Sequence, residues 1–188
     1  MAAIRILFGF VCFAFISSFD EPNSDLLNRK KLITIAESQL GVREKTDNND
    51  GLKVEEYLKT VNLKKGNPYC AAFISWVFYK AGFDQPRTGW SPALFPSSHL
   101  IMTSSKKAYL PGNLIGIYFP SLKRIAHVGM IAYRKNDWII SIEANTNVEG
   151  SREGDGVYRR RRSIRTIYGY SDWISNGSLK RRGGESWE

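Results

Sequence analysis

The spacing of apolar residues changes from a helical period to a strand-like period part-way along this chain of 188 residues. Before residue 85, apolar positions recur three and four residues apart, as on one face of a helix. From Leu114 onward they fall in short β-rich runs separated by turn residues. Helices followed by an antiparallel sheet predict an α+β domain.

Two helices are expected before residue 62. The first is predicted from a cap at Ser24 or Asn23 up to Gly41, because apolar residues recur at helical intervals and glycine commonly ends a helix. The second is predicted to begin at a cap on Asp50, because Val54, Tyr57, Leu58 and Val61 recur at i, i+3, i+4 and i+7.

A third helix has the clearest pattern, with apolar residues at i, i+3, i+4, i+7, i+8 and i+11 and Gly82 after them. Its stripe consists of Cys70, Phe73, Ile74, Val77, Phe78 and Ala81. Cys70 is therefore expected to begin the face that packs on the core.

Five short strands are expected in the second half of the chain. They are predicted over residues 114–119, 125–133, 138–143, 157–162 and 166–170. The segment 85–109, rich in proline and serine, is expected to be irregular.

The first 18 residues have the pattern of a secretory signal. Arg5 is followed by the apolar run Ile6–Ile16 and by Ser17 and Ser18. The run is shorter than the roughly 20 residues that a membrane-spanning helix needs, so no permanent membrane anchor is expected. The signal predicts a secreted protein, periplasmic or extracellular.

One domain is expected over residues 24–176, and the polar, basic residues 177–188 are expected to be disordered. The formal net charge of +9 suits an anionic partner. Charge alone does not choose among peptidoglycan with its acidic polymers, nucleic acid and a membrane surface, and ordinary solubility explains it equally well.

Of the two cysteines, only Cys70 lies outside the predicted signal. A lone thiol in an exported protein pairs between chains, is fully buried, or does chemistry. The start of a helix stabilises a thiolate by roughly 0.3–1 kcal/mol, less than one pKa unit. A nearby imidazolium is therefore needed to make the thiolate dominant near neutral pH.

The chain offers two histidines, His99 and His127. His127 stands in a β-like run of small and apolar residues, where an imidazole is unusual, and is the favoured base. His99 lies in the irregular segment, where a surface role is the simpler interpretation.

Glu143 and Asn145 are candidates to orient His127. The runs 125–133 and 138–143 are expected to form a hairpin. If the turn centres on Lys135, Glu143 lies directly across from His127; half a residue later, Glu143 is diagonal. Asn145 shares its side if the strand continues. This is the nucleophile, base and orienter set of cysteine hydrolases. Both residues also suit ordinary strand-end and turn roles.

Four motifs, in order, resemble the CHAP family of cysteine, histidine-dependent amidohydrolases/peptidases over about residues 30–176. The motifs are Asn67–Trp76, Ala126–Gly129, Ile142–Thr146 and Gly156–Arg161.

The resemblance implies a papain-like fold, with N-terminal helices on a C-terminal antiparallel sheet. It also implies catalytic Cys70, His127, Glu143 and Asn145, and no metal or cofactor. Two positions depart from the family pattern. Tyr69 stands where tryptophan is frequent, and Asn113 stands where aspartate is frequent.

Several assignments stay open. Asn49 and Asn67 are alternative side-chain donors for an oxyanion, together with the Cys70 N–H. Trp90 suits a substrate groove or ordinary packing, and Arg159–Arg162 suit an anionic ligand or a solvated face. The loop 46–51 does not match an EF-hand, but another calcium geometry is not excluded.

The expected function is hydrolysis of an amide or peptide bond in bacterial peptidoglycan through a cysteine thioester. The enzyme would be an N-acetylmuramoyl-L-alanine amidase or an endopeptidase, acting at the glycan–peptide junction or within the stem peptide. No nucleic-acid partner is expected. The alternatives are a non-catalytic wall-binding module of the same fold and an antibacterial effector with the same chemistry, which would have an immunity protein as partner.

Overall fold

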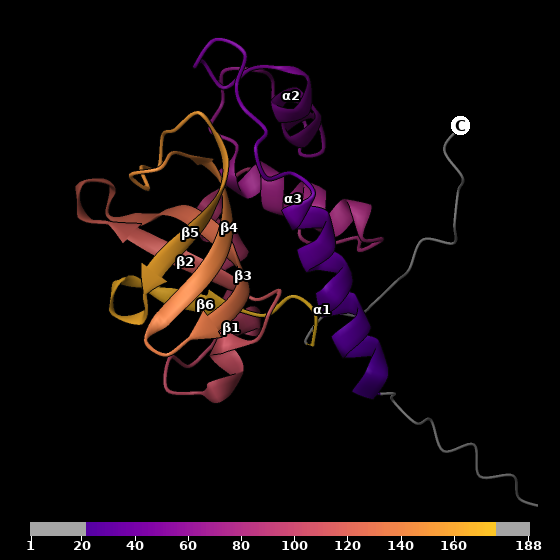
Figure 1. Ribbon diagram of the computed structural model, residues 1–188, viewed down its shortest axis with the longest axis vertical. Helices are drawn as coiled ribbons and strands as arrows, with labels where there is room; N and C mark the ends of the chain where they lie inside the picture. The colour runs from indigo at the N-terminus through magenta and orange to yellow at the C-terminus, as the bar shows by residue number, and fades with distance from the viewer. Residues whose placement is uncertain (1–21, 176–188) are drawn as a thin grey trace, which may run out of the picture.

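A computed structural model describes residues 22–175 and has three helices and one six-stranded antiparallel sheet (Figure 1). The helices are α1 (Pro22–Glu37), α2 (Leu52–Lys59) and α3 (Cys70–Lys80). The strands are β1 (Leu100–Ile101), β2 (Leu114–Phe119), β3 (Arg124–Lys135), β4 (Trp138–Thr146), β5 (Gly156–Ser163) and β6 (Gly169–Ser171). The α+β class is confirmed.

The strand order is β1-β6-β2-β3-β4-β5. Strands β2 to β5 follow one another as antiparallel neighbours, and β6 returns to pair with β2 on its free edge. The short strand β1, inside the segment expected to be irregular, extends that edge. The rest of that segment is irregular apart from three short 3₁₀ helices, of which Ser91–Leu94 lies next to the site.

Helix α3 forms the centre of the main core. Its first nine residues are all buried, and the helix packs against α1, α2, β3 and β4. In Figure 1, α1 and α3 lie on one side of the curved sheet, with α2 beyond one end of it. A second, smaller apolar cluster lies around Ile115, Ile131, Ile139 and Tyr170. Cys70 thus starts a buried helix directed at the sheet, as its apolar stripe predicts.

The predicted helix caps are wrong. Helix α1 begins at Pro22 and so includes positions 23 and 24. Asp50 does not cap α2, whose N-cap is Gly51; the carboxylate instead accepts hydrogen bonds from the backbone of Lys45 and Thr46. Asp50 therefore stabilises its own loop, a frequent alternative role for this residue type.

Two predicted segments lie outside the described residues: the signal, 1–18, and the tail, 177–188. Among residues 22–175, no helix is long and apolar enough to span a bilayer.

Arg29 connects α1 by hydrogen bonds to the residues just before β2 and just after β6. Its buried guanidinium donates to Asp172 at 2.7 Å, to Asn113 at 2.8 Å and to the carbonyl of Pro111 at 3.0 Å. Asn113 also donates from its amide to the Lys107 carbonyl at 2.8 Å. An ionised aspartate has no donor for that second bond, which gives a physical reason for asparagine here.

We expect Arg29→Met to lower the free energy of unfolding by about 3 kcal/mol, because it leaves the buried Asp172 carboxylate without its cation. Lys30→Met is the matched control, since Lys30 is exposed, and its effect should stay within about 0.5 kcal/mol. Urea denaturation followed by circular dichroism measures both. Equal losses in the two variants would contradict the role given to Arg29.

Candidate active site

Cys70 is a free, nearly buried cysteine at the first position of α3, with 4% of its surface exposed. The N-cap residue, Tyr69, offers no side-chain cap, so the N–H groups of the first turn are available to the sulfur. The N–H of Ala71 hydrogen-bonds the sulfur, and the Ser91 hydroxyl lies 3.3 Å from Sγ. These groups stabilise a thiolate.

His127 and Glu143 form a buried hydrogen-bonded pair. The distance from Nε2 to Oε2 of Glu143 is 2.8 Å, and both side chains are almost wholly inaccessible to solvent. The other ring nitrogen, Nδ1, has no partner of ordinary hydrogen-bond length within residues 22–175. It is the nitrogen left for the Cys70 thiol, which interacts with this imidazole.

The thiol and the imidazole shift each other's pKa toward an ion pair. Burial by itself raises the pKa of Cys70, but the hydrogen bond and charge of His127, together with the hydrogen bonds of Ser91 and Ala71, lower the pKa overall. Burial lowers the pKa of His127, whereas Cys70 and Glu143 raise it more strongly, to about 9. A thiolate and an imidazolium are thus favoured together over neutral pH.

The Glu143 carboxylate accepts two hydrogen bonds on each oxygen. Oε2 accepts from His127 and from Nη2 of Arg162 at 2.5 Å. Oε1 accepts from Nε of Arg162 at 2.9 Å and from the Ser141 hydroxyl at 2.6 Å. Burial raises the pKa of this carboxyl, but Arg162 and His127 hold it well below its usual range. The carboxylate is therefore ionised.

The register expected for the β3–β4 hairpin is wrong. The turn is formed by Asn136 and Asp137, and an irregularity between Ile131 and Tyr133 shifts the pairing again. The last recorded pair is Met130 with Ile142. Continuing that register by one residue on each strand brings residues 129 and 143 together.

Gly129 gives Glu143 the space to reach His127. A Cβ on Gly129 would lie 2.6 Å from Cγ of Glu143, so the glutamate side chain occupies the space a larger residue would fill. Glu143 thus passes over Gly129 to the imidazole, which is two residues away along β3.

The hydrogen bonds of the Asn145 side chain go to the backbone of Tyr69 and Gly154, not to His127. It lies at an irregularity in the β4–β5 pairing between Ala144 and Thr146 and has a left-handed φ of 56°. This break in alternation turns its side chain toward α3, where Oδ1 accepts the Tyr69 N–H at 2.9 Å. Asn145 therefore fixes the residue that precedes Cys70.

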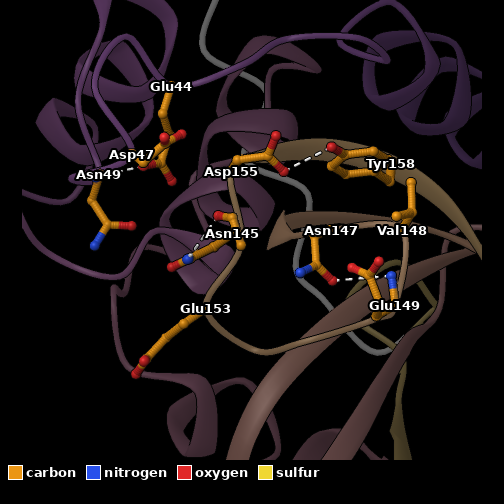
Figure 2. A pocket seen from close by; sticks show the side chains of 11 residues that line it. Glu44, Asp47, Asn49, Asn145, Asn147, Val148, Glu149, Glu153, Asp155 and Tyr158 are labelled. Carbon is orange, nitrogen blue, oxygen red and sulfur yellow. Dashed lines mark hydrogen bonds between the residues drawn. The ribbon is translucent and has the colours of Figure 1, made fainter.

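An acidic pocket of about 520 Å³ opens beside Asn145 (Figure 2). Its lining includes five carboxylates, Glu44, Asp47, Glu149, Glu153 and Asp155. Burial raises the pKa of Glu44, which also accepts the Asn49 N–H at 2.7 Å. Within residues 22–175, no group of three or more histidine, cysteine, aspartate or glutamate side chains is arranged to hold a metal ion.

The two asparagines considered for the oxyanion lie at different places. Asn49 lines the acidic pocket with Asn145, whereas the Asn67 amide donates to the Lys64 carbonyl at 2.9 Å. Within residues 22–175, neither side chain makes a hydrogen bond to Cys70.

His99 and Trp90 have partners of their own. The ring of His99 stacks on Trp173 with centroids 4.0 Å apart, and its Nδ1 lies 2.9 Å from the Asp172 carbonyl oxygen. Trp90 is 53% exposed, and the Arg124 guanidinium stacks on its indole at 4.0 Å. Trp90 directly precedes Ser91, whose hydroxyl lies next to the Cys70 sulfur.

Sequence reasoning missed Ser91 and Ser141 and left Arg162 within a run of four arginines. Ser91 comes from an irregular segment, where no periodic pattern indicates which residues face Cys70. The sequence does indicate Ser141, because strand alternation places it on the same side of β4 as Glu143. Identifying Arg162 would also require the β4–β5 register, which the sequence does not supply.

No family model matches this chain, and no curated protein matches it. Two solved structures are similar: the crystal structure of Ly7917, and that of Ly7917 with the hydrolyzing product of MDP. Both are 16% identical to this chain and cover 76% of it, with TM-scores of 0.44 and 0.42. The matched region spans 60% and 61% of those chains. A likeness of this degree assigns neither a family nor an activity.

We expect Gly129→Ala to weaken the pair of His127 and Glu143, because the new methyl group overlaps the glutamate side chain. The pKa of His127 should then fall below about 9, by roughly one unit. Gly169→Ala is the control, since a Cβ there meets nothing within 4 Å. NMR titration of the imidazole in both variants measures the effect. An unchanged His127 pKa in Gly129→Ala would disprove the spatial role of Gly129.

Proposed function

We propose that this protein is a cysteine hydrolase of amide or peptide bonds, with Cys70 as nucleophile, His127 as base and acid, and Glu143 as the group that orients His127. The observation that carries the proposal is the buried chain of contacts from the thiol through the imidazole to an ionised carboxylate. Ordered in this way, the three side chains have the relation that thiol-based acyl transfer requires.

The proposed reaction has two halves. The Cys70 thiolate attacks the carbonyl carbon, and the His127 imidazolium passes its proton to the departing amine as the carbon–nitrogen bond breaks. The neutral imidazole then takes a proton from water, whose oxygen attacks the thioester and releases the acid and the thiolate. Glu143 keeps the ring aligned and stabilises its charged form.

The oxyanion of each half-reaction would form near the start of α3. The N–H of Cys70 lies in the first turn, where backbone donors have no helical partner. The Ser91 hydroxyl, 3.3 Å from Sγ, is a second donor near that place. Asn145 contributes indirectly, because its bond to the Tyr69 N–H fixes the backbone that leads into this turn.

We propose bacterial peptidoglycan as the substrate, cleaved at the glycan–peptide junction or within the peptide, by a CHAP-type enzyme with a papain-like fold. The sequence motifs around Cys70, His127 and Glu143 support this assignment. A secretory signal in residues 1–18 would deliver the enzyme to the periplasm or the cell exterior, where peptidoglycan lies.

Cys70→Ala should reduce the release of soluble fragments from purified peptidoglycan by about a thousand-fold or more, and His127→Ala should do so to a similar degree. His99→Phe is the matched control, because it keeps a ring against Trp173 and should leave the rate unchanged. Mass spectrometry of the fragments identifies the bond cleaved. Full activity in Cys70→Ala would exclude the mechanism, and loss only in the His99 variant would reassign the base.

The wild-type rate should fall at alkaline pH with a midpoint near 9, the pKa of His127, because the leaving amine needs the imidazolium proton. Glu143→Gln removes the charge that stabilises imidazolium, so this midpoint should move down by about one unit or more. Asn145→Ala should lower the rate with little movement of the midpoint, since Asn145 bonds Tyr69.

Glu37→Gln is the control for these pH profiles, because its ion pair with Arg159 is at the surface. It should change neither the rate nor the alkaline midpoint. An alkaline midpoint that moves in the Asn145 variant and not in Glu143→Gln would reverse the assignment of the orienting group.

A further inference from the structure

A second ion pair of the buried cluster joins Glu143 to a residue outside the proposed catalytic set. Arg162 on β5 meets the carboxylate with two donors, Nε at 2.9 Å and Nη2 at 2.5 Å. This two-donor geometry fixes the plane of the carboxylate as well as its charge. The arginine side chain is itself mostly buried, with 16% exposed.

Arg162 differs from its three neighbours in the arginine run. Arg159 pairs with Glu37 at the surface, and Arg161 stacks on Trp138 at 3.9 Å. Arg160 shares the sheet face of Arg162 but donates to the Val148 carbonyl. Only Arg162 of these four bonds Glu143, so the run is not a uniform solvated face.

We propose that Arg162 is a positioning residue of the active site, which holds Glu143 ionised and aligned so that Glu143 can stabilise the His127 imidazolium. The inference rests on the proposed function, because it gives Arg162 a role only through the reacting pair of Cys70 and His127.

Burial of Glu143 makes this support necessary. An ionised carboxylate without a compensating charge is strongly disfavoured in a protein interior, and such a group takes up a proton instead. His127 compensates the carboxylate only while the imidazole is charged, whereas an arginine stays charged throughout the accessible pH range. Arg162 therefore keeps Glu143 ionised whatever the state of His127, and a protonated Glu143 would no longer favour imidazolium.

The charged and titratable groups around this cluster come from α3, β3 and β5, and one of them is Arg160, the register partner of Ser141, which donates to the Val148 carbonyl. Glu143 meets His127 from β3 and Arg162 from β5, and Cys70 faces the imidazole from α3. Tyr158 is the register partner of Glu143 on β5, but its hydroxyl donates to Asp155 at 2.7 Å. The pH dependence of Cys70 alkylation therefore reports on His127, Glu143 and Arg162.

The experiment follows alkylation of Cys70 by iodoacetamide across pH, which detects the thiolate without any substrate. In Arg162→Met, Glu143 should bind a proton, the imidazolium should lose its partner, and the acid-side midpoint of alkylation should rise by about one pH unit. Arg161→Met is the matched control and should keep the wild-type midpoint, because Arg161 is exposed and contacts Trp138. An unchanged or lowered midpoint in Arg162→Met overturns the proposal.

A double-variant comparison separates this role from simple support of the fold. In a Glu143→Gln background, Arg162→Met should move the midpoint no further, because Arg162 acts through the Glu143 charge. A further shift of equal size there would overturn the proposal. Arg162→Lys keeps the charge, and it should give a rise smaller than that of Arg162→Met; if the methionine variant does not fold, a wild-type midpoint in Arg162→Lys overturns the two-donor role.

Failure of the role proposed for Arg162 and failure of the proposed function give different results. If the midpoints shift as expected but wild-type protein releases nothing from peptidoglycan, the substrate assignment fails and the role of Arg162 stands. If wild-type protein cleaves peptidoglycan and the Arg162 variants alkylate like wild type, the proposed function stands and the inference fails.

Discussion

The site depends on a carboxylate that is ionised although it is fully buried. Glu143 retains its charge because four hydrogen bonds and two cationic groups surround it, and those partners come from three adjacent strands, β3, β4 and β5. The sheet register is thereby tied to the electrostatics of the site. A shift of one residue in either pairing would turn a member of this cluster to the other sheet face.

The second requirement is that Cys70 lies at a fixed place relative to the sheet. Helix α3 is buried along nearly its whole length, so its first turn cannot move without repacking the core. Asn145 adds a direct bond from β4 to the residue before Cys70. The strand that supplies the carboxylate thus also anchors the start of the helix that supplies the thiol.

Charge is distributed unevenly over this basic protein. The chain carries a formal net charge of +9, yet five carboxylates line the pocket beside Asn145. Arg162 of β5 belongs to the Glu143 cluster, and Arg160 donates to the carbonyl of Val148, a residue that lines the pocket. Each of the four arginines of β5 has a partner of its own. Net charge therefore says little about the local charge near the start of α3.

The sequence by itself determined the α+β class, helix α3 with Cys70 at its start, and the approximate extents of β2 to β5, because these follow from local periodicity. It did not determine the hairpin register. The two-residue turn at Asn136 and Asp137 and the irregularity between Ile131 and Tyr133 are local features, and each of them shifts every later residue pair. Only the tertiary structure decided that Glu143 bonds His127 while Asn145 bonds Tyr69. Only it separated Arg162 from the other arginines and brought Ser91 to the thiol, because these contacts join segments far apart in the chain.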